Sequence, residues 1–477
     1  MEVKGKAVTV LGLARSGVGA ARLLDRLGAR VTVTDKKGPQ DLGPYLALLG
    51  PGIRHVLGEH PPGLFEEASL IVVSPGVPLT IAPLKRAKEK GVKIIGELEL
   101  AYQAVAHGLL DMACGEERIP SFLAVTGANG KSTTTTLLYE MLKENGTGVM
   151  VGGNIGNALT EEILKRAEDG CRTSPALTSI VAEVSSFQLE TIDAFRPKGA
   201  AILNITPDHL DRYHSMEEYI AAKCRIFENQ GAGDFLVLNA DDPVTAALEA
   251  ERLRGREKGP QVFFFSRQRE VRGAYYRGGL IHFALPEPAQ VSGAFTLDPA
   301  TFRIRGVHNI ENAMAASLMA LLAGCSKDAV RGALSVFPGL EHRLEFVREL
   351  NGVQFINDSK GTNAGAVIKS LESFSSPIIL IAGGRDKDSD FTLLRPLIEE
   401  RVKALVLIGE AREKIRKAVG GGKEVFLTDD FGEAVRKARD LAVPGDVVLF
   451  SPACASFDMF RDFEDRGKQF KRIVEGL

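Results

Sequence analysis

The first hundred residues alternate short apolar runs with patterns typical of amphipathic helices. Apolar runs that predict buried strands occupy residues 7–11, 30–34, 71–76 and 93–95. Helical patterns at 18–27 and 82–90 lie between these runs. Because strands separated by helices indicate a parallel sheet, we predict a Rossmann-like α/β domain over residues 1–96.

The alternation continues through the middle of the chain. The predicted elements are strands at 122–125, 179–184 and 200–204, helices at 131–144 and 308–323, and a small antiparallel sheet over 262–305. Residues 107–120 are polar and predict a mobile surface insertion. We assign residues 97–338 to a central domain built on a parallel sheet of the P-loop ATPase type.

The last part of the chain returns to regular α/β alternation. Strands are predicted at 353–357, 378–382, 404–408, 424–428 and 446–450, with helices between them and a closing helix at 457–474. This pattern predicts a second doubly wound, Rossmann-like domain over residues 339–477. The chain of 477 residues is too long for one core, which agrees with three domains.

Composition narrows the function classes. The chain has 44% hydrophobic residues, 25% charged residues and a formal net charge of −2. That charge gives no reason to expect nucleic acid or an anionic membrane as a partner. The five cysteines have no paired spacing, which favours reduced thiols over disulfides or a zinc site. With no apolar run of about 18 residues, we expect a cytoplasmic protein without membrane insertion, and a monomer.

The turn between residues 126 and 130 is the first candidate for chemistry. Its glycines allow backbone N–H groups to converge on phosphate oxygens, and the N-terminus of the next helix favours an anion. Lys131 is placed to neutralise phosphates and Ser132 to bind Mg²⁺. Only two residues separate Gly127 from Gly130, whereas the common phosphate loop has four. The alternative is an ordinary strand-to-helix turn.

A second glycine turn lies at residues 12–17. It is similar to a dinucleotide-binding fingerprint in which Ala14 replaces the middle glycine, and Asp35 ends the next strand. The pattern is consistent with a nucleotide-type ligand, and equally with any tight turn between a strand and a helix.

Three ionisable residues follow strands of the central sheet. Glu183 ends one strand, His209 follows the next, and Lys223 lies on the helix after it. Since parallel strands place their carboxyl ends at one edge of a sheet, these residues are expected near the phosphate loop. Ser132 and Glu183 would then hold one Mg²⁺ against ATP phosphates. Taken singly, His209 is typical of a core or capping residue and Lys223 of a solvated helix lysine.

Eight further motifs occur in a fixed order along the chain. They are GGNIG (152–156), EVSSFQLE (183–190), LNITPDHLDRY (203–213), AAKCRIFEN (221–229), GVHNIENAMAA (306–316), HR (342–343), INDSKGTN (356–363) and SPACASFDMFRDFEDRG (451–467). Together with TGANGKS they resemble the motifs of the Mur ligase family over nearly the whole chain. The match is closest to the D-glutamate-adding members.

The resemblance implies two cofactors, ATP and Mg²⁺, the latter at two sites. The implied ATP-binding residues are Gly127, Asn129, Gly130, Lys131, Ser132, Thr133, Asn309, Asn312, Arg343 and Asp358. The implied metal ligands are Ser132 and Glu183 at one site, and His209 with a carbamylated Lys223 at the other. Lys131, Glu183, His209 and Lys223 would form the catalytic set.

The resemblance also implies the reaction and its substrates. The enzyme would join D-glutamate to UDP-N-acetylmuramoyl-L-alanine through an acyl phosphate, in peptidoglycan precursor synthesis. The uridine nucleotide would contact Arg15, Ser16, Asp35, Lys36, Ser74 and Gly76. Asn154 would contact the muramoyl part of the substrate near the reacting carboxyl, and D-glutamate would contact Thr362, Lys387, Ser456 and Phe463.

Three alternative functions remain open from the sequence. A sister ligase would add L-alanine or extend a glutamate chain. A phosphate-loop switch or binding module would use the nucleotide without ligation. A dehydrogenase would rest on the 12–17 turn and Asp35 alone.

Overall fold

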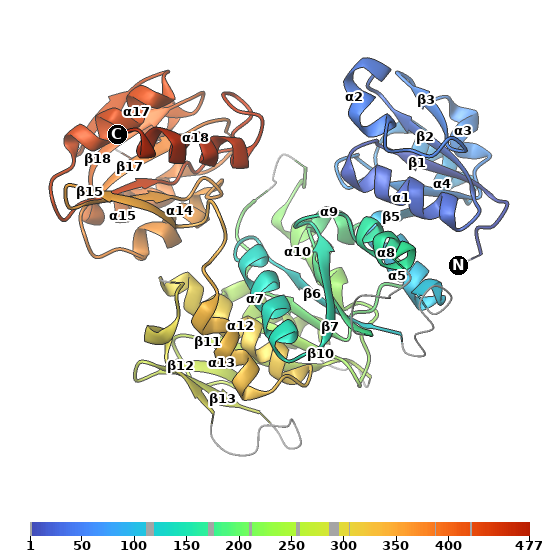
Figure 1. Ribbon diagram of the computed structural model, residues 1–477, viewed down its shortest axis with the longest axis horizontal. Coiled ribbons are helices and arrows are strands. Elements are labelled where there is room, and N and C mark those ends of the chain that lie inside the picture. The colour runs from blue at the N-terminus through green and yellow to red at the C-terminus, as the bar shows by residue number, and fades with distance from the viewer. Residues whose placement is uncertain are drawn as a thin grey trace.

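Three β-sheets, each with its own helices, make up the computed structural model of the chain. The structure describes residues 2–110, 119–169, 176–208, 212–253, 258–285, 295–304, 306–386, 388–419 and 422–477. Figure 1 shows the first and third units on either side of a larger central unit. The three-part α/β fold predicted from the sequence is confirmed.

The first sheet has five parallel strands in the order β3-β2-β1-β4-β5. The strands are β1 (Ala7–Leu11), β2 (Arg30–Asp35), β3 (Arg54–Leu57), β4 (Leu70–Val73) and β5 (Lys93–Gly96), and the helices are α1 (Arg15–Arg26), α2 (Pro39–Leu46), α3 (Pro62–Glu66) and α4 (Ala82–Glu89). Apolar residues of β1 and β4 pack against α3 and α4 on one face of the sheet and against α1 on the other. A sheet buried on both faces explains the continuous apolar runs in the sequence.

The central sheet has nine strands in the order β14-β13-β12-β11-β10-β9-β6-β8-β7. The strands are β6 (Ser121–Thr126), β7 (Gly148–Gly153), β8 (Leu177–Glu183), β9 (Gly199–Ile202), β10 (Phe235–Asn239), β11 (Gln261–Ser266), β12 (Gly273–Arg277), β13 (Leu280–Ala284) and β14 (Thr296–Leu297). The helices are α5 (Glu97–Ala106), α7 (Lys131–Glu144), α8 (Leu159–Glu168), α9 (Ser186–Leu189), α10 (Met216–Cys224), α11 (Pro243–Leu248), α12 (Val307–Leu322) and α13 (Lys327–Val336). Helix α7 begins directly after β6, which lies between β9 and β8.

The third sheet has six strands in the order β15-β16-β20-β17-β18-β19. The strands are β15 (Glu345–Leu350), β16 (Val353–Asn357), β17 (Ile378–Gly383), β18 (Val402–Ile408), β19 (Glu424–Leu427) and β20 (Val447–Phe450), and the helices are α14 (Ala364–Glu372), α15 (Arg395–Arg401), α16 (Arg412–Val419), α17 (Phe431–Leu441) and α18 (Phe463–Glu475). Two apolar cores, one on each face, make the unit doubly wound.

Several details differ from the sequence predictions. Of the antiparallel sheet predicted over 262–305, β12, β13 and β14 pair antiparallel as expected, but β11 pairs in parallel with both β10 and β12. These strands therefore extend the central sheet instead of forming a separate one. Strand β15 was not predicted; it is an antiparallel edge strand whose charged residues hide the strand pattern. The closing helix begins at Phe463, where Asp462 caps it, and not at residue 457. Residues 111–118 of the predicted insertion lie outside the described residues.

Helix α5, at the start of the central unit, is held against residues 193–195 by one of its carboxylates. Glu99 on this helix is fully buried, and its carboxylate accepts hydrogen bonds from the backbone N–H groups of Asp193, Ala194 and Phe195, each at 2.9 Å. Three convergent N–H donors satisfy a buried carboxylate that would otherwise be costly to bury.

We predict that Glu99→Ala lowers the free energy of unfolding by about 2 kcal/mol or more, because three N–H groups lose their acceptor and that of Phe195 is buried. Chemical denaturation followed by circular dichroism measures the change. The control is Glu89→Ala, at an exposed position on α4, which is expected to have no comparable effect. Equal unfolding midpoints for the two variants would contradict the assigned role of Glu99.

Candidate functional site

The glycine-rich loop after β6 is held in one conformation by Asn204. The backbone N–H of Ala128 donates to the Asn204 carbonyl at 2.9 Å, and the N–H of Asn129 donates to its side-chain oxygen at 2.8 Å. The Asn204 side-chain amide in turn donates to the Asn129 carbonyl at 3.1 Å. Gly130 has φ of +84° at the start of α7, a conformation that favours glycine. The sequence analysis did not single out Asn204, although it lies within a quoted motif.

Two lysine side chains meet at one carbonyl of this loop. Lys131 Nζ and Lys223 Nζ each donate to the Gly127 carbonyl at 2.9 Å, and Lys131 also donates to the Ala128 carbonyl at 2.9 Å. Lys223 is 2% exposed, which excludes the solvated helix lysine considered from the sequence. Burial, together with the charge of Lys131, holds the pKa of Lys223 well below its usual value.

Glu183 brings a carboxylate to the same loop. It ends β8 beside β6, and its Oε1 accepts a hydrogen bond from Asn154 Nδ2 at 2.7 Å. Its Oε2 is buried and has no hydrogen-bond partner within the described part of the chain. A buried carboxylate oxygen in that position fits a divalent cation, for which oxygen ligands are preferred. Ser132, in the first turn of α7, is also buried.

The second predicted metal site cannot be compared in full, since His209 lies outside the described residues. The described ranges also contain no group of three or more His, Cys, Asp or Glu side chains arranged around a metal position. The described groups around the loop are therefore the Glu183 carboxylate, the Ser132 hydroxyl and the side chains of Lys131 and Lys223. They do not form a cage of carboxylates.

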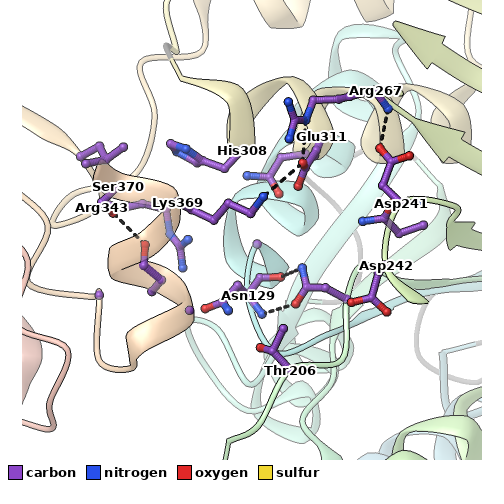
Figure 2. Close-up of a pocket in the computed structure, with 18 of the residues that line it drawn as sticks. Asn129, Thr206, Asp241, Asp242, Arg267, His308, Glu311, Arg343, Lys369 and Ser370 are labelled. Carbon is purple, nitrogen blue, oxygen red and sulfur yellow. Dashed lines mark hydrogen bonds and ion pairs between the residues drawn. The ribbon is translucent and has the colours of Figure 1, made fainter. Parts of the chain in front are cut away.

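A cavity of about 250 Å³ lies beside the loop, between the central and third units. Figure 2 shows Asn129 and Thr206 on one side of it and His308, Glu311 and Lys369 on another. Central residues in its wall include Asn129, Gly130, Asn204, Asp241, Arg267 and Asn312, and third-unit residues include Arg343, Asp358, Lys369 and Ser370. Its position next to a glycine-rich loop suits a phosphorylated ligand.

Helix α12 supplies two buried amides next to the loop. Asn312 accepts a hydrogen bond from Thr134 Oγ1 at 3.2 Å and donates to Asn309 Oδ1 at 3.2 Å. A Cβ atom at Gly130 would lie 2.4 Å from Asn312 Oδ1. Close approach of α12 to the loop therefore requires glycine at position 130 for steric as well as conformational reasons.

Arg343 lines the cavity and lies between two residues with a left-handed backbone conformation. The two residues beside it, His342 and Leu344, have φ of +64° and +43°. Asp358 also lines the cavity and accepts hydrogen bonds from Ser370 Oγ at 2.7 Å and Ser451 Oγ at 2.6 Å. Burial lowers the pKa of Arg343 and raises that of Asp358.

Contacts across the cavity connect the third unit to the central one. Lys369 Nζ lies 3.6 Å from Glu311 Oε1, and Arg267 Nε donates to the same oxygen at 2.7 Å (Figure 2). Ser373 Oγ lies 3.1 Å from His308 Nδ1. The sequence analysis missed these residues, since pairs far apart in sequence leave no local signal. His308 and Glu311 do lie inside the quoted GVHNIENAMAA motif.

A further lysine that was missed lies on the third unit. Lys360 Nζ is 4.7 Å from the centre of the Phe463 ring, a cation–π distance. Burial lowers the pKa of Lys360 to about 8, and the charge of Glu183 opposes this shift. Phe463 is tied to the same segment because its carbonyl accepts a hydrogen bond from Ser359 Oγ at 2.8 Å.

Of the other predicted D-glutamate residues, two lie near this segment. The N–H of Thr362 donates to the Lys360 carbonyl at 2.9 Å. Ser456 is buried in the loop before α18, where its carbonyl accepts hydrogen bonds from the N–H groups of Met459 and Phe460. Lys387 lies outside the described residues.

The predicted uridine-nucleotide residues gather on the first unit and do not line the cavity. Asp35 accepts hydrogen bonds from the N–H groups of Leu13 at 2.7 Å and Lys37 at 2.9 Å. Ser74 Oγ donates to the Gly12 carbonyl at 2.9 Å, so the 12–17 turn and the turn after β4 are joined. Arg15 and Ser16 begin α1, while Lys36 follows β2 and Gly76 follows β4. These residues form a separate candidate site.

Comparison with known proteins covers all three units. Residues 6–96 match the family described as Mur ligase MurD-like, N-terminal domain; residues 125–320 match Mur ligase middle domain; and residues 342–454 match Mur ligase, glutamate ligase domain. The chain is 47% identical to a protein of Geotalea uraniireducens named UDP-N-acetylmuramoylalanine–D-glutamate ligase, over 100% of this chain and 99% of that protein. This chain belongs to the Mur ligase family.

Other Mur ligases agree in sequence or in fold. A protein of Pelotomaculum thermopropionicum with the same name is 45% identical over 99% of this chain and 98% of its own length. The solved UDP-N-acetylmuramate-alanine ligase MurC from Thermotoga maritima matches with a TM-score of 0.59 at 18% identity, over 99% of both chains. MurF from the same organism, solved with ADP, has a TM-score of 0.58 at 18% identity, over 86% of this chain and 90% of that one.

Membership in the family settles two of the alternatives left by the sequence. Mur ligases are ATP- and Mg²⁺-dependent amide ligases, so a phosphate-loop switch without ligase activity and a dehydrogenase are both excluded. Among the helices of the described residues, none combines the length and apolar character that a membrane crossing requires.

We predict that Gly130→Ala weakens ATP binding at least tenfold. The added Cβ would crowd Asn312 at 2.4 Å and would have to adopt φ of +84°, so the loop cannot keep its shape. Isothermal titration calorimetry with a non-hydrolysable ATP analogue measures the affinity.

Gly146→Ala is the matched control. Gly146 also has a positive φ, of +73°, but a Cβ there would meet nothing within 4 Å. It is expected to cost some stability and leave nucleotide affinity unchanged. If both variants lost affinity equally, backbone strain and not the Asn312 contact would be responsible.

Proposed function

We propose that this chain is the ATP-dependent ligase that joins D-glutamate to UDP-N-acetylmuramoyl-L-alanine in peptidoglycan precursor synthesis. The observation that carries the proposal is full-length identity of 44–47% to proteins named for that reaction. The geometry supports it, since the glycine-rich loop lines the cavity and two lysines bond its Gly127 carbonyl. Glu183 also keeps a buried carboxylate oxygen that has no partner among the described residues. A sister ligase for L-alanine or for a glutamate chain is not favoured by these relatives.

The first chemical step is transfer of a phosphoryl group to a carboxylate. ATP phosphates would lie on the backbone N–H groups of the loop, with Lys131 neutralising their charge. Arg343, Asp358, Asn309 and Asn312 would hold the rest of the nucleotide. The carboxylate of the muramoyl-L-alanine attacks the γ-phosphorus, and ADP leaves. Positioning and charge neutralisation supply most of the acceleration in such a step.

The buried carboxylate oxygen of Glu183 supports one magnesium site, and we propose a second by analogy with the family. Ser132 and Glu183 would hold one, and His209 with carbamylated Lys223 would hold the other. Bound magnesium supplies charge neutralisation to the transferring phosphoryl group. Asn154, which already donates to Glu183 at 2.7 Å, would orient both that carboxylate and the muramoyl substrate.

The carbamate of Lys223 has a physical motivation. An ammonium group in this position stands next to Lys131, at the same carbonyl oxygen, and would repel a metal. The neutral amine attacks the carbon of carbon dioxide and loses a proton to solvent, which gives a carbamate whose single negative charge is shared by two oxygens. Burial of Lys223 favours the neutral amine that this reaction requires.

The second step forms the amide bond on the third domain. D-Glutamate would contact Thr362, Lys387, Ser456 and Phe463, with Lys360 as a further cation for its carboxylates. Its amine attacks the acyl carbon, and phosphate leaves from the tetrahedral intermediate. Exclusion of water from the closed cavity protects the acyl phosphate.

The domain division proposed from the sequence is consistent with this scheme. Domains at 1–96, 97–338 and 339–477 would bind uridine nucleotide, ATP and D-glutamate respectively. Gly339, with φ of +89°, would act as the hinge that brings Arg343 and Asp358 to ATP. We propose that the enzyme acts as a monomer in the cytoplasm.

A panel of amino acids tests the proposed function. Purified protein with ATP, Mg²⁺ and UDP-N-acetylmuramoyl-L-alanine is expected to release phosphate only when D-glutamate is added, and mass spectrometry should detect the amide product. A matched reaction with L-glutamate, L-alanine or glycine is expected to give no product. Strict preference for another amino acid would overturn the choice of acceptor.

We predict that Lys223→Ala abolishes ligation and that millimolar acetate or bicarbonate restores part of it. The small anion would replace the carbamate in the space left by the side chain. Product formation in the presence and absence of the anion is the measurement.

Lys131→Ala is the control for this rescue. Lys131 would act as a cation, so the same anions are expected not to help that variant. A Lys223→Ala enzyme that no anion restores would count against the carbamate, as would equal rescue of both variants.

A further inference from the structure

Arg212 connects the central unit to the first one through a three-way guanidinium contact. Its Nε and Nη2 atoms donate to the two carboxylate oxygens of Glu190 at 3.3 and 2.6 Å. Its remaining Nη1 donates to the carbonyl of Pro75 at 3.2 Å. The guanidinium also lies over the Phe187 ring, 4.3 Å from its centre. A planar fork can make all of these contacts at once, whereas an ammonium group cannot.

The central-unit side of this contact is rigid. The Glu190 backbone carbonyl accepts a hydrogen bond from Arg225 Nη1 at 2.6 Å, and its Oε1 also accepts one from the Tyr213 hydroxyl at 2.6 Å. Glu190 directly follows α9, which lies on the side of the central unit nearest the first unit (Figure 1). The position of the Arg212 guanidinium is therefore fixed by the central fold.

The first-unit side of the contact is the turn that would receive the uridine nucleotide. Pro75 lies between Ser74 and Gly76, both proposed substrate residues. Ser74 Oγ is already bonded to the Gly12 carbonyl, and the N–H of Val77 donates to the Ser74 carbonyl at 3.0 Å. The turn is thus folded by contacts within the first unit, and Arg212 sets where it lies relative to the central unit.

A chain of aromatic contacts leads from Arg212 toward the phosphate loop. The rings of Tyr213 and Tyr219 lie 5.2 Å apart, and Lys223 Nζ lies 4.7 Å from the Tyr219 ring centre. Lys223 then bonds the Gly127 carbonyl. The turn of the first unit and the phosphate loop are consequently fixed to the same packed segment.

We propose that Arg212 is a positioning residue for ligation: it sets the turn at 74–76 so that the bound uridine nucleotide presents its carboxylate to the phosphate loop. The inference rests on the proposed function. It assigns Arg212 no contact with substrate, and it predicts that loss of the fork impairs productive alignment and leaves the uridine-nucleotide site intact.

The test is Arg212→Lys, which keeps the positive charge and loses the fork. The dissociation constant of UDP-N-acetylmuramoyl-L-alanine, measured by calorimetry without ATP, is expected to stay within about twofold, since the turn folds without Arg212. The kcat for ADP release with all substrates saturating is expected to fall roughly 10- to 100-fold, the cost of a small misalignment of reacting groups. Phe187→Leu, which removes only the ring, is expected to lower kcat about threefold in the same direction.

Arg401→Lys is the matched control. Arg401 also combines a carboxylate, Glu400 at 3.2 Å, with a backbone carbonyl, that of Phe374 at 2.7 Å, but all three residues belong to the third unit. Its kcat is expected to equal that of the wild type.

The outcomes separate the two proposals. A wild-type kcat in Arg212→Lys would overturn the inference. A loss of uridine-nucleotide affinity that accounts for the whole fall in activity would also overturn it. So would an equal loss of kcat in Arg401→Lys. A wild-type protein that never releases ADP in the presence of D-glutamate would overturn the proposed function and the inference with it. An active wild type with unaffected variants would overturn the inference alone.

Discussion

The contact on which the site depends is the carbonyl of Gly127, which accepts hydrogen bonds from the Nζ atoms of two lysines. Two like charges in a buried place repel each other, and one carbonyl dipole does not balance them. Burial and the charge of Lys131 lower the pKa of Lys223 and outweigh the opposing charges of the Asp208 and Glu183 carboxylates. The arrangement therefore favours an anionic ligand on the loop or conversion of one lysine to a neutral or anionic form. ATP binding and the proposed carbamylation of Lys223 would each reduce this repulsion.

The second constraint is that the cavity wall comes from two units. Arg343 is placed in it by a linker that contains left-handed His342 and Leu344, conformations that non-glycine residues adopt only where the surroundings fix them. For His342 the surroundings include a 2.9 Å contact between its Nδ1 and Asn357 Nδ2 in a buried setting. Local strain in the linker is thus balanced by packing inside the third unit, and the Lys369–Glu311 pair then joins that unit to α12.

Much of the fold was accessible from the sequence because local patterns decide it. The helix predicted at 131–144 and the strands predicted at 7–11 and 353–357 match the observed bounds, since apolar periodicity and flanking turns are strong there. Strand β15 was missed because an edge strand buries only part of one face and carries charges. The pairing of β11 with β10, and the parallel direction of its pairing with β12, were missed because strand pairing is not local.

Some residues of the candidate site could likewise be predicted from local sequence patterns, and others could not. Lys131 and Ser132 could be predicted from a motif whose geometry is local to one turn. The burial of Lys223 could not, because helix position alone says nothing about what packs over the helix. Lys360 and Asn204 lie inside quoted motifs but do their work through contacts with distant residues. For His209 and Lys387 the expectation stays a prediction, since both lie outside the described residues.

The arrangement of the three units explains why alignment, and not only affinity, should limit this reaction. The candidate residues for the carboxylate substrate lie mainly on the first unit, those for the amine on the third, and those for the nucleotide on the central and third units. Bond formation then requires that contacts between units fix the approach of one bound group to the next within fractions of an ångström. On the amine side that connection is the proposed hinge at Gly339 with the partly buried Lys369–Glu311 pair, whose separation would permit opening and product release. On the carboxylate side it is a guanidinium fork seated on a rigid carboxylate, which holds one geometry. The Arg212 contact between the first and central units is rigid, whereas the contact between the central and third units can separate. The cavity can therefore open while the carboxylate of the substrate stays aligned with the phosphate loop.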